Sequence, residues 1–164
     1  MSARRLLFLF PMRSAASSEF EPGGTREVSN MAEAQMERSE VIAIVNSSDD
    51  TVEMVRECLY HSGFTNVVTA HIQEIRDGET DFLAFVERHQ PRVFIYDISI
   101  PYDRNWRFLQ LLMTAFAMRG RRVIVTTTNK RALDELVGPT GAIEVIGKPY
   151  DLDQIVKAVR TALE

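Results

Sequence analysis

The sequence predicts a doubly wound α/β fold built on a five-stranded parallel sheet. From Val41 onward, short apolar runs rich in β-branched residues alternate with segments of helical periodicity. The runs are apolar on both faces, as expected of parallel strands that are covered by helices on either side. The composition agrees, since 164 residues with 45% hydrophobic and 26% charged side chains are typical of one globular domain.

The expected strands and helices alternate along the chain. The strands are expected at Val41 to Val45, Val67 to Ala70, Val93 to Tyr96, Val123 to Thr127 and Ile143 to Ile146. The helices are expected at Thr51 to Ser62, Thr80 to His89, Asn105 to Met118, Lys130 to Val137 and Asp151 to Leu163. Asp50 and Glu53 resemble a capping box for the first helix, Gly63 is suited to end it, and Asp151 can cap the last one. The segment from Ala70 to Glu79 is expected to be a long loop.

The first forty residues differ from the rest of the chain. Ser, Ala, Glu, Gly and Arg dominate there, and Pro22-Gly23-Gly24 interrupts any periodicity. We therefore expect a flexible extension over residues 1–40 and a folded domain over residues 41–164. An alternative is that translation begins at Met31 or Met36.

Charge, hydropathy and cysteine content exclude several classes of protein. The net charge of −4 argues against nucleic-acid binding, which needs a cationic face. The longest apolar run, Leu6 to Met12, is far shorter than the ~20 residues that span a bilayer, so no membrane segment is expected. The single cysteine, Cys58, cannot form an internal disulfide, which favours the cytoplasm. Cys58 lies on the apolar stripe of the first predicted helix, so we expect it to be a core residue.

Three reactive side chains follow predicted strands. Asp97 comes after the third strand, Thr127 ends the fourth, and Lys148 comes after the fifth. The carboxyl ends of parallel strands meet at one edge of a sheet, so a carboxylate, a hydroxyl and an ammonium are expected to lie there together. Pro149 restricts Lys148 to an extended backbone and directs its side chain back over the sheet edge, where it can pair with a carboxylate.

The stretch from residue 41 to 164 has these three side chains at its predicted strand ends. It resembles the receiver domain of two-component response regulators, which has a flavodoxin-like fold. The segments that carry the resemblance are Asp97 to Pro101, Thr127, Gly141-Ala142 and Lys148 to Tyr150. They occur in the expected order and at the expected strand exits.

The resemblance implies a phosphorelay function. Asp97 would accept a phosphoryl group from a sensor histidine kinase or a phosphotransfer protein, with Mg²⁺ neutralising the phosphoryl oxygens. Thr127 would donate its hydroxyl to the acyl phosphate and Lys148 would pair with it. Asp97, Asn46 and the backbone carbonyl of Ser99 are the candidate metal ligands. Such a protein is not an enzyme; it signals to a downstream protein through the face formed by the fourth helix, fifth strand and fifth helix.

The sequence departs from the receiver pattern at the metal site. Receivers place two acidic residues at the end of the first strand, and Asn46 and Ser47 stand there instead. Because Mg²⁺ is commonly bound through carboxylates, we expect weak or absent Mg²⁺ binding. Val145 stands where receivers often carry an aromatic switch residue, and Asn105 replaces a common glycine.

Two functional hypotheses remain open. The first is a stand-alone response regulator that is phosphorylated on Asp97 and acts by docking to a partner. The second is a pseudo-receiver, an interaction module that is not phosphorylated and lacks a competent metal site. A small α/β enzyme or flavin carrier has little support, because no glycine-rich phosphate-binding motif follows the first strand. The three histidines, His61, His71 and His89, share no short motif and are expected in surface or capping roles.

Overall fold

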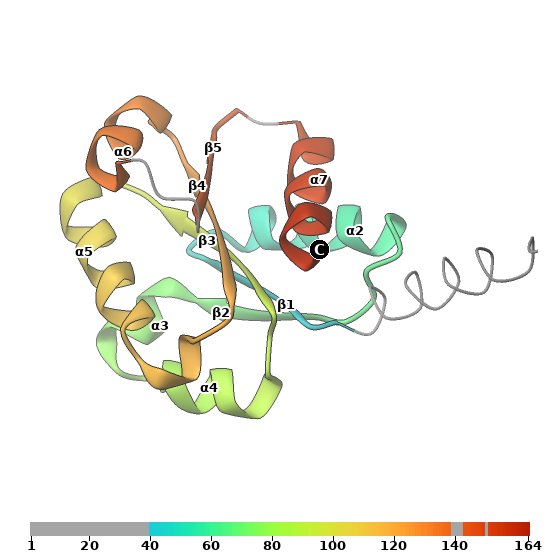
Figure 1. Cartoon of the computed structure of the whole chain (residues 1–164), viewed down its shortest axis with the longest axis horizontal. Coiled ribbons are helices and arrows are strands. Elements are labelled where there is room, and N and C mark those ends of the chain that lie inside the picture. Colours follow the sequence, from blue (N-terminus) through green and yellow to red (C-terminus); the bar gives the residue numbers. More distant parts are fainter. Residues whose placement is uncertain (1–39, 139–142, 150) are drawn as a thin grey trace, which may run out of the picture.

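The predicted five-stranded parallel sheet is confirmed. The computed structural model describes residues 40–138, 143–149 and 151–164, so the predicted extension lies almost wholly outside the described residues. The strand order is β2-β1-β3-β4-β5, and every neighbouring pair is parallel (Figure 1). The strands are β1 (Ile42–Asn46), β2 (Val67–His71), β3 (Val93–Ile98), β4 (Arg122–Thr127) and β5 (Ile143–Gly147).

Helices cover both faces of this sheet and bury two hydrophobic cores. They are α2 (Asp49–His61), α3 (Ile72–Asp77), α4 (Phe82–His89), α5 (Tyr102–Met113), α6 (Lys130–Val137) and α7 (Leu152–Leu163). Helices α2 and α7 pack on one face, and α3 to α6 lie on the other (Figure 1). The strands alternate between the two cores: Ile44 and Ile95 face α2 and α7, whereas Val45 and Tyr96 face the opposite helices.

The segment predicted as a long loop contains a helix. Helix α3 occupies six residues between β2 and α4, and its Ile72 and Ile75 are buried in the core. His71 caps the start of α3, because its Nδ1 accepts a hydrogen bond from the Gln73 amide at 3.3 Å. Gly78 ends α3 with φ at 76°. A helix this short shows only one apolar i, i+3 pair, which is too little periodicity to predict it.

The N-cap of α2 differs from the prediction, because it is a serine two positions before the predicted Asp50. Ser48 is the N-cap, and its hydroxyl accepts from the Thr51 amide at 3.3 Å, whereas Asp50 lies inside the first turn. The two other predicted terminal residues, Gly63 and Asp151, are confirmed. Gly63 follows α2 with φ at 97°, a backbone conformation that favours glycine. Asp151 caps α7 by accepting from the Asp153 amide at 3.1 Å.

The helix expected at Asn105 to Met118 starts earlier and ends earlier. Helix α5 begins directly after Pro101, so Asn105 falls inside its first turns. It ends at Met113, where the Thr114 hydroxyl bonds back to the Leu111 carbonyl at 2.6 Å, and a 3-10 helix follows at Phe116–Met118. The apolar spacing continues through both helices, which is why the sequence pattern merges them.

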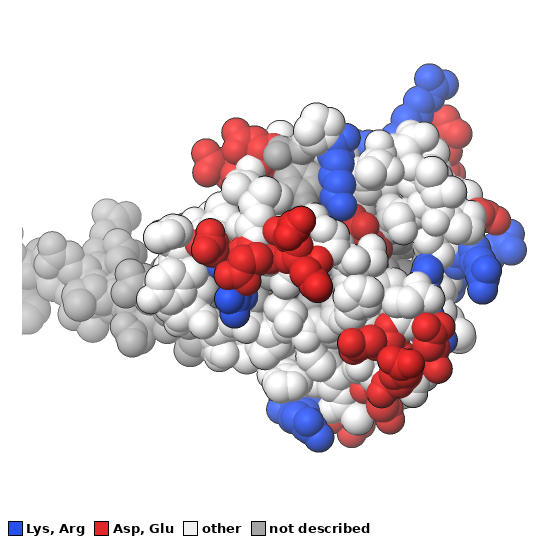
Figure 2. All heavy atoms as spheres, turned by 180° about the vertical axis from the view of Figure 1, so that it is seen from behind, with Lys and Arg blue, Asp and Glu red and all other residues white. Residues whose placement is uncertain are grey.

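The surface is mixed in charge. In the view from behind, acidic side chains gather in separate patches with basic side chains between them, and no continuous basic surface is visible on this face (Figure 2). Within the described residues, no helix combines the length and the apolar character needed to cross a membrane.

Candidate functional site

The candidate site lies at the edge of the sheet where β1, β3, β4 and β5 end. Asp97 is the penultimate residue of β3, and its side chain is only 6% exposed. Lys148 directly follows β5, and its Nζ lies 2.7 Å from Asp97 Oδ1. The sequence therefore predicted this carboxylate and ammonium as neighbours, and the structure brings them together. The ion pair is largely withdrawn from water, which strengthens the attraction between the two charges.

The hydroxyl that contacts Asp97 belongs to Thr126 and not to Thr127, whose expected role toward an acyl phosphate stays a prediction. Thr126 Oγ1 donates to Asp97 Oδ1 at 2.9 Å. Asp97 pairs in register with Thr126, so these two side chains point to the same face of the sheet, and Thr127 points to the opposite face. Thr127 is fully buried there, and its Oγ1 accepts a hydrogen bond from the Asn129 amide at 3.3 Å. The register of β3 against β4, together with the alternation of side chains along each strand, places Thr126 rather than Thr127 beside Asp97.

The side chain of Asn46, a candidate metal ligand, accepts hydrogen bonds from the backbone of the β1–α2 loop. Its amide is 4% exposed, and Oδ1 accepts from the Ser47 amide at 2.8 Å and the Ser48 amide at 3.0 Å. An asparagine that bonds the backbone one and two residues onward stabilises a turn. Asp49 and Asp50 are exposed in the first turn of α2, where their charges favour the helix N-terminus.

The Ser99 carbonyl, the third candidate ligand, also has a partner. Asn105 donates to it through Nδ2 at 2.7 Å, and the Asn105 side chain is only 3% exposed. Asn105 Oδ1 in turn accepts a hydrogen bond from the guanidinium of Arg76 in α3. Sequence reasoning noted Asn105 only as a departure from glycine, and it had no signal for the contact with Arg76.

The residues at this edge do not fit a tightly bound divalent cation. Asp97 is the only anionic donor among the three candidates, and Lys148 already balances its charge. The Asn46 and Ser99 oxygens both accept N–H groups. Within the described part of the chain, no group of three or more His, Cys, Asp or Glu side chains could hold a metal ion. A hard cation such as Mg²⁺ prefers anionic oxygen donors, and the one carboxylate among these candidates is already paired with an ammonium.

Two contacts tie the loops around Asp97 to each other. The Tyr102 hydroxyl, at the start of α5, lies 2.8 Å from the Thr128 hydroxyl in the β4–α6 loop. On the other side, the Lys148 amide donates to the Thr127 carbonyl at 2.6 Å. The β4–α6 loop is therefore held by α5 on one side and by the end of β5 on the other.

Two titratable groups near the cores have shifted pKa values. Burial raises the pKa of the Tyr96 phenol to about 12, and its hydroxyl has no hydrogen-bond partner among the described residues. Burial also raises the pKa of the Cys58 thiol, with a smaller contribution from Asp153. A thiol with a raised pKa is less reactive, and Cys58 is partly buried against the core under α2 and α7, so its predicted core position is confirmed only in part.

The comparisons with known proteins support the resemblance that the motifs indicated. No family model matches the chain. The response regulator Rre1 of Synechocystis is 27% identical over 109 residues, which are 62% of this chain and 47% of that protein. The chain thus spans about half the length of the curated relative it matches.

Solved structures show the same architecture. The chemotaxis response regulator CheY4 of Vibrio cholerae superposes with a TM-score of 0.56 at 21% identity, covering 75% of this chain and 98% of that one. A signal receiver domain from Clostridium thermocellum reaches a TM-score of 0.62 at 14% identity, covering 77% and 98%. The chain therefore has the flavodoxin-like receiver fold, and its similarity to response regulators is confirmed in sequence and in fold.

Proposed function

We propose that this chain, which has the receiver fold and a response regulator among its relatives, works in phosphorelay signal transduction and accepts a phosphoryl group on Asp97. The observation that carries this proposal is the way Asp97 is held. Oδ1 receives both the Lys148 ammonium and the Thr126 hydroxyl, and Oδ2 accepts no hydrogen bond from the described residues. One oxygen is thus fixed, and the other is available as a nucleophile.

The transfer would be a substitution at phosphorus. Asp97 Oδ2 forms the new O–P bond while the bond from phosphorus to the donor atom breaks, and the donor leaves with that electron pair. The donor atom is an imidazole nitrogen in a phosphorylated histidine or an acyl oxygen in acetyl phosphate. Lys148 and Thr126 lie where an ammonium and a hydroxyl can bind the transferred phosphoryl oxygens. The chain would act as a signalling module and not as an enzyme with its own diffusible substrate.

We further propose that Mg²⁺ binds weakly or not at all at this edge. The support is the donor set: one carboxylate that is already paired with Lys148, and two neutral oxygens that already accept N–H groups. Phosphoryl transfer to Asp97 is accordingly expected to be slow. The single free cysteine supports the cytoplasm as the place of action.

Intact-mass spectrometry tests the acceptor directly. The full chain is incubated with acetyl phosphate, with and without Mg²⁺, beside the variants Asp97→Asn and Asp103→Asn. Asp103 is an exposed carboxylate six residues further along the chain, so it is a matched control. We expect one phosphoryl adduct in the wild type and in the Asp103 variant, and none in the Asp97 variant. A wild type without an adduct, or an adduct that survives Asp97→Asn, would refute phosphorylation at Asp97.

The second candidate function is a pseudo-receiver that acts by binding alone. It is favoured by the β1 end, where an amide that bonds its own loop replaces an acidic residue. In that case no adduct forms, and the Asp97→Asn variant binds its partner as the wild type does. The double variant Asn46→Asp/Ser47→Asp distinguishes the two further. A gain of Mg²⁺-dependent adduct there, with none in the wild type, would establish that the metal site limits the chemistry.

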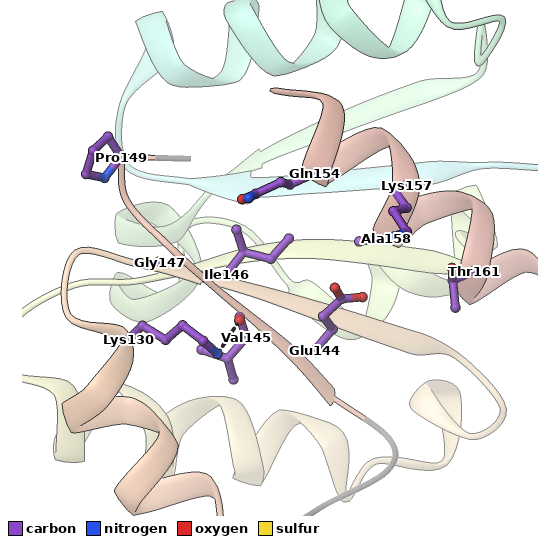
Figure 3. Close-up of a pocket in the computed structure, with 10 residues that line it drawn as sticks. All are labelled: Lys130, Glu144, Val145, Ile146, Gly147, Pro149, Gln154, Lys157, Ala158 and Thr161. Carbon is purple, nitrogen blue, oxygen red and sulfur yellow. Dashed lines mark hydrogen bonds between the residues drawn. The ribbon is translucent and has the colours of Figure 1, made fainter. Parts of the chain in front are cut away.

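Under either function, we propose α6, β5 and α7 as the face that binds a downstream protein. A groove of about 710 Å³ runs between these elements. Its floor includes Val145 and Ile146 of β5, and Lys130 and Lys157 stand on opposite sides (Figure 3). An apolar floor with polar rims is suited to a protein side chain or helix.

The α6 side of this groove is fixed closely to β5. Lys130 Nζ donates to the Val145 carbonyl at 2.7 Å (Figure 3). The same ammonium pairs with Asp134 at 3.1 Å. A Cβ atom on Gly147 would lie 2.9 Å from the Lys130 Cβ, so the glycine permits this approach. Val145 supplies no aromatic ring at this position. A conformational change caused by phosphorylation of Asp97 would therefore have to reach the α6–β5–α7 face through the end of β5.

Hydrogen exchange tests the link between Asp97 and this face. Exchange is compared before and after treatment with acetyl phosphate, with Asp97→Asn as the control. We expect changed exchange in β5 and the first turn of α7, and unchanged exchange in α4, which does not line this groove. Equal exchange at β5 in both states of an adduct-bearing protein would contradict a role for this face.

A further inference from the structure

Both loops that flank Asp97 are attached to the short helix α3. On the β3 side, Asn105 links the Ser99 carbonyl to the guanidinium of Arg76, which belongs to the last turn of α3. On the β1 side, His71 Nε2 lies 3.2 Å from the Ser47 carbonyl, and His71 is the N-cap of α3. One six-residue helix therefore contacts the β1–α2 loop at its start and, through Asn105, the β3–α5 loop at its end.

The hydrogen-bond roles in these links are fully determined. The Ser47 carbonyl can only accept, so His71 Nε2 carries the proton, and Nδ1 accepts from the Gln73 amide at 3.3 Å. The two ring nitrogens thus satisfy both the loop and the helix cap. Asn105 likewise uses both ends of its amide, with Nδ2 on Ser99 and Oδ1 on Arg76. A buried amide with both ends satisfied specifies one position for the groups it joins.

Arg76 is held on its other side by an aromatic ring. Its guanidinium lies 6.0 Å from the centroid of the Phe108 ring in α5, within the range of a cation–π contact. Arg76 also lines a cavity of about 270 Å³ between α3 and α5, together with Arg104. Arg104 makes no hydrogen bond or ion pair with the described residues. The two arginines share this cavity, but only Arg76 reaches Asn105.

We infer that α3 takes the place of a divalent cation as the cross-link between the two loops beside Asp97, with Arg76, Asn105 and His71 as its positioning residues. In a metal site of this type, the cation would draw the β1 and β3 loop oxygens together. Here protein N–H groups bind these loop carbonyls instead. Asn105 donates to the Ser99 carbonyl, and His71 donates to the Ser47 carbonyl. This inference rests on the proposed function only in that it concerns the same loops. It explains how they keep their positions when the donors for a cation are missing.

Matched arginine variants test this role by hydrogen exchange. Arg76→Gln and Arg104→Gln each remove one exposed guanidinium from the same cavity, and only the first breaks the link to Asn105. The reporters are the amides of the β3–α5 loop and the Asn105 amide, which bonds the Pro101 carbonyl at 3.1 Å. We expect exchange there to become about tenfold faster in Arg76→Gln, equivalent to roughly 1.4 kcal/mol of local stability, and unchanged in Arg104→Gln.

A second variant and a metal titration keep the outcome decisive. His71→Phe should speed exchange of the Thr51 and Val52 amides, which lie in the first turn of α2 and bond Ser48 of the β1–α2 loop, and leave the β3–α5 loop unchanged. Addition of excess Mg²⁺, at about 10 mM, should leave hydrogen exchange in both loops of the wild type unaltered. Equal exchange in the two arginine variants, or loops that Mg²⁺ protects in the wild type, would overturn the inference. Neither readout involves phosphorylation, so a missing adduct would count against the proposed function alone.

Discussion

Lys148 offers a quantitative test of the site, because among the described residues it is the only cation that is paired with a buried carboxylate. Replacing it by methionine keeps most of the side-chain volume and leaves Asp97, 6% exposed, with the Thr126 hydroxyl as its only side-chain partner in the described part of the chain. Removing one partner of a fully buried ion pair costs about 3–5 kcal/mol. Since the Lys148 side chain is 25% exposed, we expect about 2 kcal/mol, or a fall in Tm of about 6–8 °C.

A double-mutant cycle separates the ion pair from other effects. Asp97→Asn keeps a hydrogen-bond acceptor for Thr126 and Lys148, so we expect it to cost about 1 kcal/mol or less. In the double variant Asp97→Asn/Lys148→Met no charge is left unpaired, and the loss should be about 1 kcal/mol smaller than the sum of the single losses. Urea unfolding at pH 7 measures all four proteins. Additive losses, or a Lys148→Met loss below about 0.5 kcal/mol, would refute a coupled buried pair at this edge.

Further predictions concern the cap of α2 and the two groups with shifted pKa values. Ser48→Ala should lower the free energy of unfolding by about 1 kcal/mol and Asp50→Ala by well under half of that in urea titrations, because only Ser48 caps the helix. The raised pKa of Tyr96 means that its contribution to stability is complete below pH 10 and is lost as the pH rises toward 12. Tyr96→Phe should therefore flatten the alkaline loss of stability, and it should not destabilise the protein at pH 7, since the hydroxyl has no partner among the described residues. Cys58, which is partly buried and whose pKa burial raises, should react with a thiol reagent more slowly in the native protein than in urea, and equal rates would contradict its packing against the core.

The sheet could be predicted because its central strands can be recognised from their own residues. Ile42 to Val45 and Val93 to Tyr96 are buried on both faces, so each appears as a continuous apolar run. Helix α3 could not be predicted, since its ends are set by the His71 imidazole and the positive φ of Gly78 and not by a repeated apolar pattern. Its inward-facing Ile72 and Ile75 are equally compatible with a loop that packs on the core.

The site was predicted where it depends on topology and missed where it depends on register. Asp97 and Lys148 leave strands that end at one edge, and that fact alone brings them together. The choice between Thr126 and Thr127 needs the pairing of β3 with β4, which a residue count along the chain does not supply. The link from Asn105 to Arg76 needs the packing of α3 on α5, two elements whose contact leaves no pattern in the sequence. The roles of all these residues in phosphoryl transfer stay predictions.

Lys148 also has a consequence for how such a protein can change over time. Its side chain neutralises Asp97, and its backbone amide joins the end of β5 to the Thr127 carbonyl. The stability of this edge of the sheet and its response to the charge on Asp97 therefore depend on the same residue. Selection for heat resistance and selection for a stronger signal would act on one position, and neither property could be tuned there without altering the other.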